Sequence, residues 1–244
     1  MKLDILAIAA HPDDAELSCS GTLMLHKLKG YKTGIIDLTQ GELGSRGSIE
    51  LRKQESAEAS KIMQLDVREN LKFRDGFFVN DEAHQLALIQ MIRKYQPDIV
   101  LANAPTDRHP DHGRAAALTK DACYYAGLIK IETTLDGENQ KPWRPKKIFN
   151  YIQDQYLNPD FVIDISETIV QKMQCINAYK SQFLDDGVNG PATYISSEEY
   201  TDRVKYRNDL MGKKIGVKYG EGFLSIHSHV GLKSFDDFIF PEFA

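Results

Sequence analysis

The chain has 244 residues, of which 42% are hydrophobic and 27% charged, with a formal net charge of −5 at pH 7. This is typical globular composition, and the acidic balance argues against a nucleic-acid-binding protein, which usually has a basic excess. Three cysteines without a C-x-x-C pair predict a reducing, cytoplasmic location. No signal-peptide pattern and no apolar run long enough to cross a bilayer is evident.

Strands and helices alternate through the first half of the chain. The continuous apolar run at residues 3–10 predicts a strand that is covered on both faces. The elements predicted after it are a helix at 16–29, a strand at 32–38, a helix at 49–65 with Ser48 as its N-cap, a strand at 69–73, a helix at 81–95, a strand at 99–104 and a helix at 114–126. This order predicts an α/β, Rossmann-like fold, with a mainly parallel sheet and helices on both faces.

The second half of the chain is less regular. Residues 133–145 are expected to form an exposed loop, and residues 147–152 and 161–165 short strands. Ser166 is predicted to cap a helix that ends near residue 178, and Ser196 with Glu199 a capping box for a helix to residue 211. A late strand or loop follows at 220–230. Because no repeat or linker interrupts the pattern, we expect residues 1–244 to form a single domain.

Two polar loops follow predicted strands and carry an unusual density of ligand side chains. "HPDD" at residues 11–14 follows the first strand, and "HPDH" at residues 109–112 follows the fourth. Ligands of open α/β sheets bind at the carboxyl ends of the strands, and in a doubly wound order the first and fourth strands are neighbours. We therefore expect the two loops to meet.

The side chains of these loops are suited to a metal centre. His11, Asp14 and His112 make a two-histidine, one-carboxylate set, which is common in catalytic zinc sites that keep one position for water. Asp13, beside them, is positioned to act as a general base. The alternative interpretation is that Pro12 and the two acids form only a turn and a helix N-cap.

Several longer segments resemble one protein family. "AHPDDAELSCSGTL", "GELGSRGSIELRKQES" and "DRHPDH" are similar to the LmbE-like, or PIG-L-type, N-acetylglucosaminyl deacetylases. The resemblance continues through "NYI", "FVIDISE", "AYKSQF" and "GVKYGEGF", and so covers nearly the whole chain. It is greatest for the bacillithiol-pathway branch that deacetylates N-acetylglucosaminyl malate. The resemblance implies metal-dependent hydrolysis of the acetamide on a sugar, with Zn²⁺, or another divalent ion such as Fe²⁺, as cofactor.

The resemblance also implies roles for individual residues. His11, Asp14 and His112 become metal ligands and Asp13 the general base, while His109, when protonated, stabilises the oxyanion or protonates the leaving amine. Asp111 is expected to orient His109 and to favour its charged form. The expected substrate contacts are Arg52, Arg108 and Tyr200. An arginine can bind a carboxylate through two parallel hydrogen bonds, and malate has two carboxylates.

Other interpretations remain open at this stage. The aglycone beyond the sugar is malate, inositol or another sugar, and the same ligand set occurs in non-haem iron oxygenases. A non-catalytic sugar- or metal-binding protein is a third class, although simple binding needs neither Asp13 nor His109. His227 and His229 share one face of the late strand and are a weak candidate for a second metal site. The family resemblance implies a small-molecule substrate and a homo-oligomer, a trimer or hexamer, without nucleic acid or membrane partners.

Overall fold

The structure, a computed structural model, describes residues 1–184, 190–226, 230–232, 234 and 237. His227 and His229 therefore lie outside the described residues. Within these ranges, seven strands form one sheet in the order β3-β2-β1-β4-β7-β9-β8. The strands of this sheet are β1 (Ile5–Ala9), β2 (Thr33–Thr39), β3 (Val67–Phe73), β4 (Ile99–Ala102), β7 (Lys147–Tyr151), β8 (Phe161–Asp164) and β9 (Gly220–Ser225).

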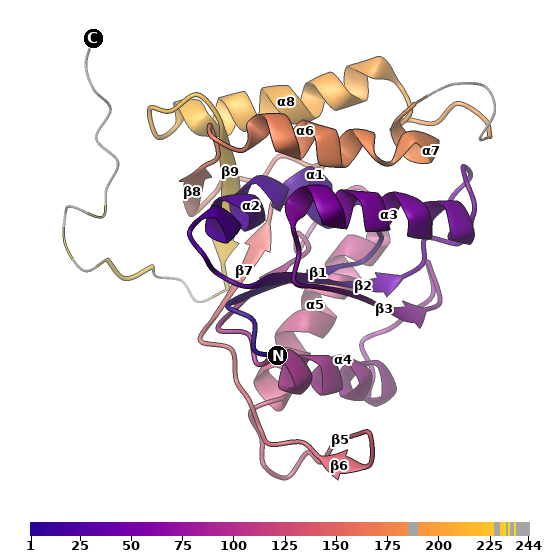
Figure 1. The fold of residues 1–244 in the computed structure, drawn as a ribbon, viewed down its shortest axis with the longest axis vertical. Helices are drawn as coiled ribbons and strands as arrows, with labels where there is room; N and C mark the ends of the chain where they lie inside the picture. Colours follow the sequence, from indigo (N-terminus) through magenta and orange to yellow (C-terminus); the bar gives the residue numbers. More distant parts are fainter. Residues whose placement is uncertain (185–189, 227–229, 233, 235–236, 238–244) are drawn as a thin grey trace.

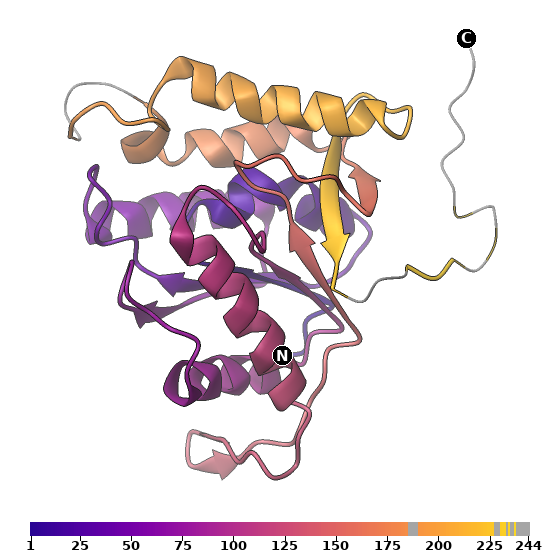
Figure 2. The ribbon, with the colours of Figure 1, turned by 180° about the vertical axis from the view of Figure 1, so that it is seen from behind.

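Helices cover both faces of the sheet (Figures 1 and 2). One layer consists of α1 (Asp14–Ser18), α2 (Ser20–Leu28), α3 (Ile49–Met63), α6 (Ile169–Asn177), α7 (Lys180–Phe183) and α8 (Glu198–Lys213). The opposite layer consists of α4 (Glu82–Tyr95) and α5 (Pro110–Tyr125). A short antiparallel hairpin, β5 (Thr134–Leu135) with β6 (Glu138–Asn139), projects beyond α4 where a loop was predicted.

The strand pairing confirms the predicted α/β fold with a mainly parallel sheet. The strand pairs β1–β2, β2–β3, β1–β4 and β4–β7 are all parallel. Only the late strand β9 differs, because it runs antiparallel to both β7 and β8. The first and fourth strands are neighbours, so the loops that follow them emerge side by side at the same edge of the sheet.

The two hydrophobic cores explain the uninterrupted apolar run at the start of the chain. Ile5, Ala7 and Ala9 of β1 belong to the core beneath α1, α3 and α6. The alternating residues Leu6 and Ile8 belong to the core beneath α4 and α5. Since successive side chains of a strand point to opposite faces, a strand buried on both sides needs apolar residues throughout.

Two predicted helix boundaries in the first half are wrong. The single helix predicted at residues 16–29 is broken at Cys19 (φ −139°, ψ 10°), which separates α1 from α2. The helix predicted from residue 114 begins at Pro110, so "HPDH" forms its first turn rather than a loop. His109 is the N-cap, its Nδ1 accepting from the backbone N–H of Asp111, and proline suits the first helical position.

Two predicted N-caps in the second half are displaced. Helix α6 begins after Thr168, because the Ser166 hydroxyl instead accepts from the backbone N–H of Tyr219. Helix α8 begins after Ser197, since the Ser196 hydroxyl bonds to the backbone of Thr193. Ser48 does cap α3 as predicted, accepting from the N–H of Leu51 at 3.2 Å.

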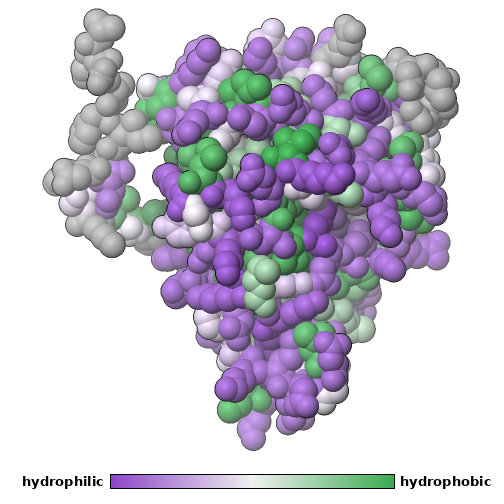
Figure 3. Space-filling model, in the orientation of Figure 1, coloured by the Kyte–Doolittle hydropathy of each residue, from purple (hydrophilic) through white to green (hydrophobic). Residues whose placement is uncertain are grey.

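The surface agrees with the composition. The face in Figure 3 is mostly hydrophilic, with small separate apolar areas. No helix in the described part of the chain is both long and apolar enough to span a bilayer. All three cysteines are unpaired, as the sequence predicts, and all three are buried.

Candidate functional site

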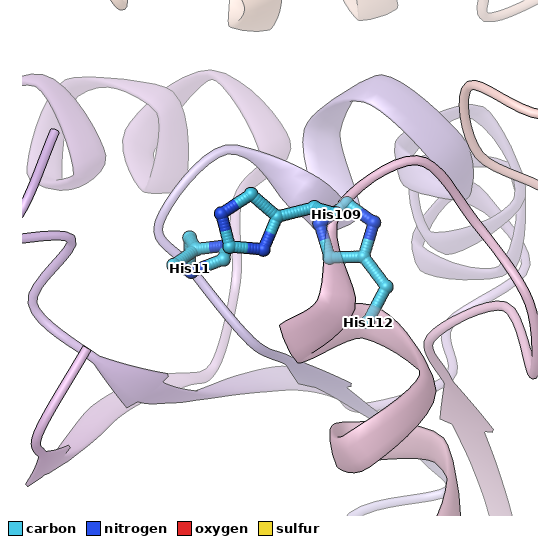
Figure 4. A group of neighbouring side chains, drawn as sticks. All are labelled: His11, His109 and His112. Carbon is cyan, nitrogen blue, oxygen red and sulfur yellow. The ribbon is translucent and has the colours of Figure 1, made fainter. Parts of the chain in front are cut away.

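The two polar loops meet beyond the carboxyl ends of β1 and β4. His11 follows β1, while His109 and His112 lie at the start of α5, and their three rings form one cluster (Figure 4). The ring centroid of His11 lies 4.7 Å from that of His109 and 5.7 Å from that of His112. The prediction that the two loops meet, although they are about a hundred residues apart, is confirmed.

Asp14 lies between two of the three imidazoles. Its Oδ1 is 3.1 Å from Nε2 of His112, and its Oδ2 is 3.6 Å from Nδ1 of His11. The ligand atoms of His11, His109 and His112 also lie within 4.8 Å of one another, as do those of His11, Asp75 and Asp111. Several buried imidazole nitrogens and carboxylate oxygens therefore lie close together around His11. Zinc and ferrous iron prefer metal ligands of these two kinds.

The charges around the two histidines favour a cation. Burial alone lowers the pKa of His112, but the Asp14 and Asp107 carboxylates outweigh it and raise this pKa to about 9. Burial likewise opposes the charged form of His11, whose pKa its carboxylate neighbours hold well above the usual range. Without another cation, these imidazoles take up protons to neutralise the surrounding acids. A divalent ion would supply the same positive charge, so the residues fit a metal.

A second layer of acids orients the two imidazoles. Nδ1 of His112 lies 2.5 Å from Oδ2 of Asp107, and Nε2 of His11 lies 3.0 Å from Oδ1 of Asp75. A carboxylate on one ring nitrogen fixes the proton there and leaves the other nitrogen free as a ligand. The free nitrogens are then Nε2 of His112 and Nδ1 of His11, the two atoms that face Asp14.

Two side-chain amides hold Asp14 in place. Nδ2 of Asn103 donates to its Oδ2 at 3.0 Å, and Nε2 of Gln153 donates to its Oδ1 at 3.1 Å. Sequence analysis missed these two amides and also Asp75 and Asp107. Their shared signal is position, since Asn103 and Asp107 follow β4, Gln153 follows β7 and Asp75 follows β3.

Asp13 adopts a strained backbone conformation. Its φ of 122° lies where residues other than glycine are rare, and its side chain makes no capping hydrogen bond to α1. The turn-and-cap interpretation therefore does not explain this residue. Burial raises the pKa of Asp13 to about 7, and Asp14 adds to that rise, while the Arg52 guanidinium opposes it.

Arg52 is buried at the site rather than solvated on its helix. It is 7% exposed, and its Nη2 lies 3.7 Å from Oδ2 of Asp13 and also donates to Gln182. Gly41 makes room for it: a Cβ at that position would lie 2.2 Å from Nη1 of Arg52, and its φ of +66° also favours glycine. The glycine-rich loop after β2 thus forms a wall of the site around this arginine.

The expected partnership of Asp111 with His109 needs correction. The Asp111 carboxylate accepts from the backbone N–H of Gly76 and from Arg114, and it lies 3.4 Å from Nε2 of His11. Only the backbone N–H of Asp111 reaches His109, donating to Nδ1 at 3.2 Å. Burial, together with repulsion from His11 and His112, lowers the pKa of His109. These effects favour the neutral imidazole, and because Nδ1 accepts from the backbone, the proton of the neutral form lies on Nε2.

A cavity of about 470 Å³ opens over these groups. His11, Asp13, Asp14, His109 and His112 line it, together with Arg52, Arg108 and Tyr200 from the expected substrate contacts. Sequence analysis missed Tyr194, which also lines the cavity and lies beneath the Arg108 guanidinium, 4.8 Å from its ring centre.

The remaining expected contacts lie at different depths of this cavity. The Tyr200 ring is 5% exposed and stacks on Phe183, and burial raises the pKa of its hydroxyl above the ordinary value. The Arg108 side chain is 51% exposed at the rim and donates to Asp154. The histidines and carboxylates thus converge at the switch point of an α/β sheet, beneath an open cavity. These features place the protein in the class of α/β proteins with a candidate catalytic metal centre.

The family model and the curated relatives that match this chain indicate one family. The family model "PIG-L: GlcNAc-PI de-N-acetylase" matches residues 6–123. The chain is 31% identical over 165 residues to the "Uncharacterized deacetylase YaiS" of Escherichia coli, a match covering 62% of this chain and 83% of that protein. We conclude that the chain belongs to the PIG-L/LmbE-like deacetylase family.

Other relatives are similar over most of their length. The diacetylchitobiose deacetylase of Thermococcus kodakarensis is 26% identical over 228 residues, covering 89% of this chain and 81% of that one. A probable N-acetyl-alpha-D-glucosaminyl L-malate deacetylase 2 of Bacillus anthracis is 21% identical, covering 80% and 93%. The solved structure of conserved protein TT1542 from Thermus thermophilus superposes with a TM-score of 0.83 at 37% identity, covering 95% and 98%.

Proposed function

We propose that this protein hydrolyses the acetamide of an N-acetylglucosamine conjugate to acetate and a free amine, with a divalent metal as cofactor. The observation that carries the proposal is the position of Asp14 between His11 and His112, with the strained Asp13 beside it at the floor of an open cavity. Membership of the deacetylase family supports this interpretation of the arrangement. We also propose that residues 1–244 act as one domain, because strands from both halves form one sheet.

His11, Asp14 and His112 would hold the metal, either zinc or ferrous iron. When bound, the ion would supply Lewis-acid activation of water and of the acetamide carbonyl. The protein favours the tautomers this requires, since Asp107 and Asp75 would hold the remaining proton on the opposite ring nitrogens once an ion replaces the protons that face Asp14.

Asp13 is the proposed proton carrier. It takes a proton from the attacking water and returns it to the amide nitrogen as the C–N bond breaks, so that acetic acid and a neutral amine form. The acid then gives its proton to water or to the released amine and leaves as acetate. A pKa of about 7 suits both halves of this transfer. Arg52 keeps the Asp13 carboxylate oriented toward the cavity.

His109 is the proposed donor to the oxyanion. Its neutral imidazole carries the proton on Nε2, because Nδ1 accepts from the backbone of Asp111. As in the sequence prediction, His109 donates a hydrogen bond to the oxyanion, but it does so as a neutral imidazole and not as a charged one. Tyr200, whose hydroxyl stays protonated, is a second donor from the cavity wall.

There are two candidates for the aglycone, the group attached to the N-acetylglucosamine. Malate is supported by the likeness to the Bacillus anthracis protein and by the exposed Arg108 at the cavity rim, which can bind a carboxylate. A second sugar ring is supported by the likeness to the Thermococcus kodakarensis protein and by Phe77, which lines the cavity while 63% exposed. We place malate first, because an exposed guanidinium at the rim suits its charge.

The test is acetate release from a matched panel: N-acetylglucosaminyl malate, an N-acetylglucosaminyl inositol conjugate, diacetylchitobiose and free N-acetylglucosamine. We expect the malate conjugate to have the highest kcat/KM and Arg108→Gln to lower that value about ten-fold. Equal rates on charged and neutral aglycones would remove malate and leave the deacetylase proposal intact. No acetate from any conjugate would remove the deacetylase proposal.

Two assays separate the other classes of protein. An oxygenase with the same ligands needs O₂, so a hydrolase should keep its full rate under anaerobic conditions. A binding protein would bind the conjugates, seen by calorimetry, without releasing acetate.

A further inference from the structure

The helix that carries Asp14 ends abruptly inside the protein. Helix α1 has only five residues, and α2 restarts directly after Cys19. Such a break leaves the last carbonyls of α1 and the first N–H groups of α2 without helical partners. Because both helices are buried here, water cannot satisfy these groups, and side chains must do so.

A buried lysine satisfies the carbonyl side of the break. Lys172 reaches from α6, and its Nζ donates to the carbonyls of Glu16 at 3.1 Å and Leu17 at 3.0 Å. The Ser20 hydroxyl also donates to the Glu16 carbonyl, and Arg207 to that of Leu17, but Lys172 is the donor that reaches both. Its side chain is 0% exposed. A cation at a helix C-terminus also complements the negative end of the backbone dipoles.

A buried glutamate satisfies the N–H side. Glu221 reaches from β9, and its two oxygens accept from the backbone N–H groups of Gly21 at 3.0 Å and Thr22 at 2.7 Å. A Cβ at Gly21 would lie 3.0 Å from Oε1 of Glu221 and 2.9 Å from Cδ1 of Ile165, so glycine lets the carboxylate approach.

The two charges also pair with each other. Nζ of Lys172 lies 2.7 Å from Oε1 of Glu221, whose side chain is 1% exposed. The pair thus bridges the helix break, with its positive end on α1 and its negative end on α2. Neither residue lines the candidate cavity, so neither contacts the substrate.

We propose that the Lys172–Glu221 ion pair is a positioning element that fixes α1, and with it Asp13 and Asp14, relative to the histidines. A helix of five residues has too few internal hydrogen bonds to be stable alone. The strained Asp13, which precedes α1, persists only if its surroundings hold it. The consequence for metal binding rests on the proposed function, whereas the consequence for the order of α1 does not.

The test is hydrogen exchange of the backbone amides of residues 14–23 in the full chain. In the double variant Lys172→Met/Glu221→Gln, which removes both charges together, we expect exchange in this segment to rise at least ten-fold. Exchange in α5, on the other face of the sheet, should stay unchanged. Glu221→Asp, which keeps the charge and shortens the reach, should show a smaller rise in the same segment, and it decides the question if the double variant does not fold.

Arg93→Met is the matched control. Arg93 is a buried cation that donates to the carbonyl of Ala126, the C-cap of α5, and to those of Leu128 and Ile131 in the loop that follows. These groups lie far along the chain from α1. We expect this variant to lower the Tm without changing exchange at residues 14–23. The double variant should also bind Zn²⁺ at least ten-fold more weakly, measured by competition with a chromophoric chelator, whereas Arg93→Met should not.

Unchanged exchange at residues 14–23 in the folded variants would overturn the proposal, as would a rise spread evenly over the whole chain. A wild-type protein that binds no metal would instead refute the proposed function. The exchange result would then still decide whether the ion pair positions α1.

Discussion

A buried charged cluster lies at each end of α1, and these two clusters differ in how completely their groups are paired. At the break after α1, Lys172 and Glu221 bond to each other and to four backbone groups, and both side chains are almost fully buried. At its start, His11, Asp13, Asp14 and His112 crowd together and line a cavity.

The contrast separates structural charges from candidate catalytic ones. In the closed cluster every ionised group has partners of opposite sign or backbone caps, so its charges stabilise one arrangement. In the open cluster Asp13 and Asp14 are adjacent acids, and the pKa values of Asp13, His11 and His112 are all raised. Perturbed acids and bases beneath a cavity are typical of functional sites.

The largest effect is expected from His112→Ala in the open cluster. The variant loses one of three proposed ligands and with it the stabilisation of the transition state by the metal. Because that stabilisation amounts to several kcal/mol, we expect kcat to fall about a thousand-fold or more. Acetate release and bound metal, measured on the same sample, should fall together. The Tm of the metal-free protein should also fall, because the charged His112 imidazole pairs there with the buried Asp14 and Asp107 carboxylates. Full activity in this variant would contradict the assignment of a catalytic role to the open cluster.

Asp13→Asn should separate chemistry from metal binding. We expect kcat to fall about 10²- to 10⁴-fold, because the proton carrier is lost, with metal content near one ion per chain. The companion variant Asp13→Gly should be equally inactive but more stable by about 1 to 3 kcal/mol, since glycine adopts a φ of 122° without strain. Denaturant unfolding checks the second result, and a less stable Asp13→Gly would contradict the strain argument.

Lys172→Met tests the closed cluster by itself. It leaves Glu221 buried and without its cation, so we expect the free energy of unfolding to fall by about 3 kcal/mol or more. Urea unfolding monitored by circular dichroism gives this value. If stability were unchanged, the description of this pair as structurally essential would be wrong.

Asp107→Asn should have the smallest effect of the series. Its carboxylate contacts Nδ1 of His112, and removal of such a partner costs about 10- to 100-fold in metal affinity. At saturating metal, kcat should recover toward the wild-type value, unlike in Asp13→Asn. Chelator competition measures the affinity. Asp154→Asn, which changes an acid that pairs with Arg108 and contacts none of the proposed ligands, is the control expected to bind metal normally.

Much of this arrangement follows from local sequence patterns. The strand–helix alternation predicted a parallel sheet, and the order of strands predicted that "HPDD" and "HPDH" would meet. These predictions hold because strand periodicity and the rules of right-handed crossover depend on nearby residues.

The remaining features depend on distant contacts that local patterns do not encode. The break at Cys19 has no glycine or proline at the break itself, and the pair that stabilises it comes from α6 and β9, about 150 and 200 residues later. The antiparallel direction of β9 and the contacts of Asp111 likewise depend on tertiary packing. The sequence motifs therefore contain the proposed ligands but not the residues that hold them in place.

The most direct test of the central claim is acetate release from N-acetylglucosamine conjugates by one preparation, before and after removal of metal. We predict that treatment with a chelator abolishes release and that one equivalent of Zn²⁺ or Fe²⁺ per chain restores it in the wild type but not in Asp13→Asn. Release that persists in fully metal-free protein, or equal restoration in both proteins, would contradict the account.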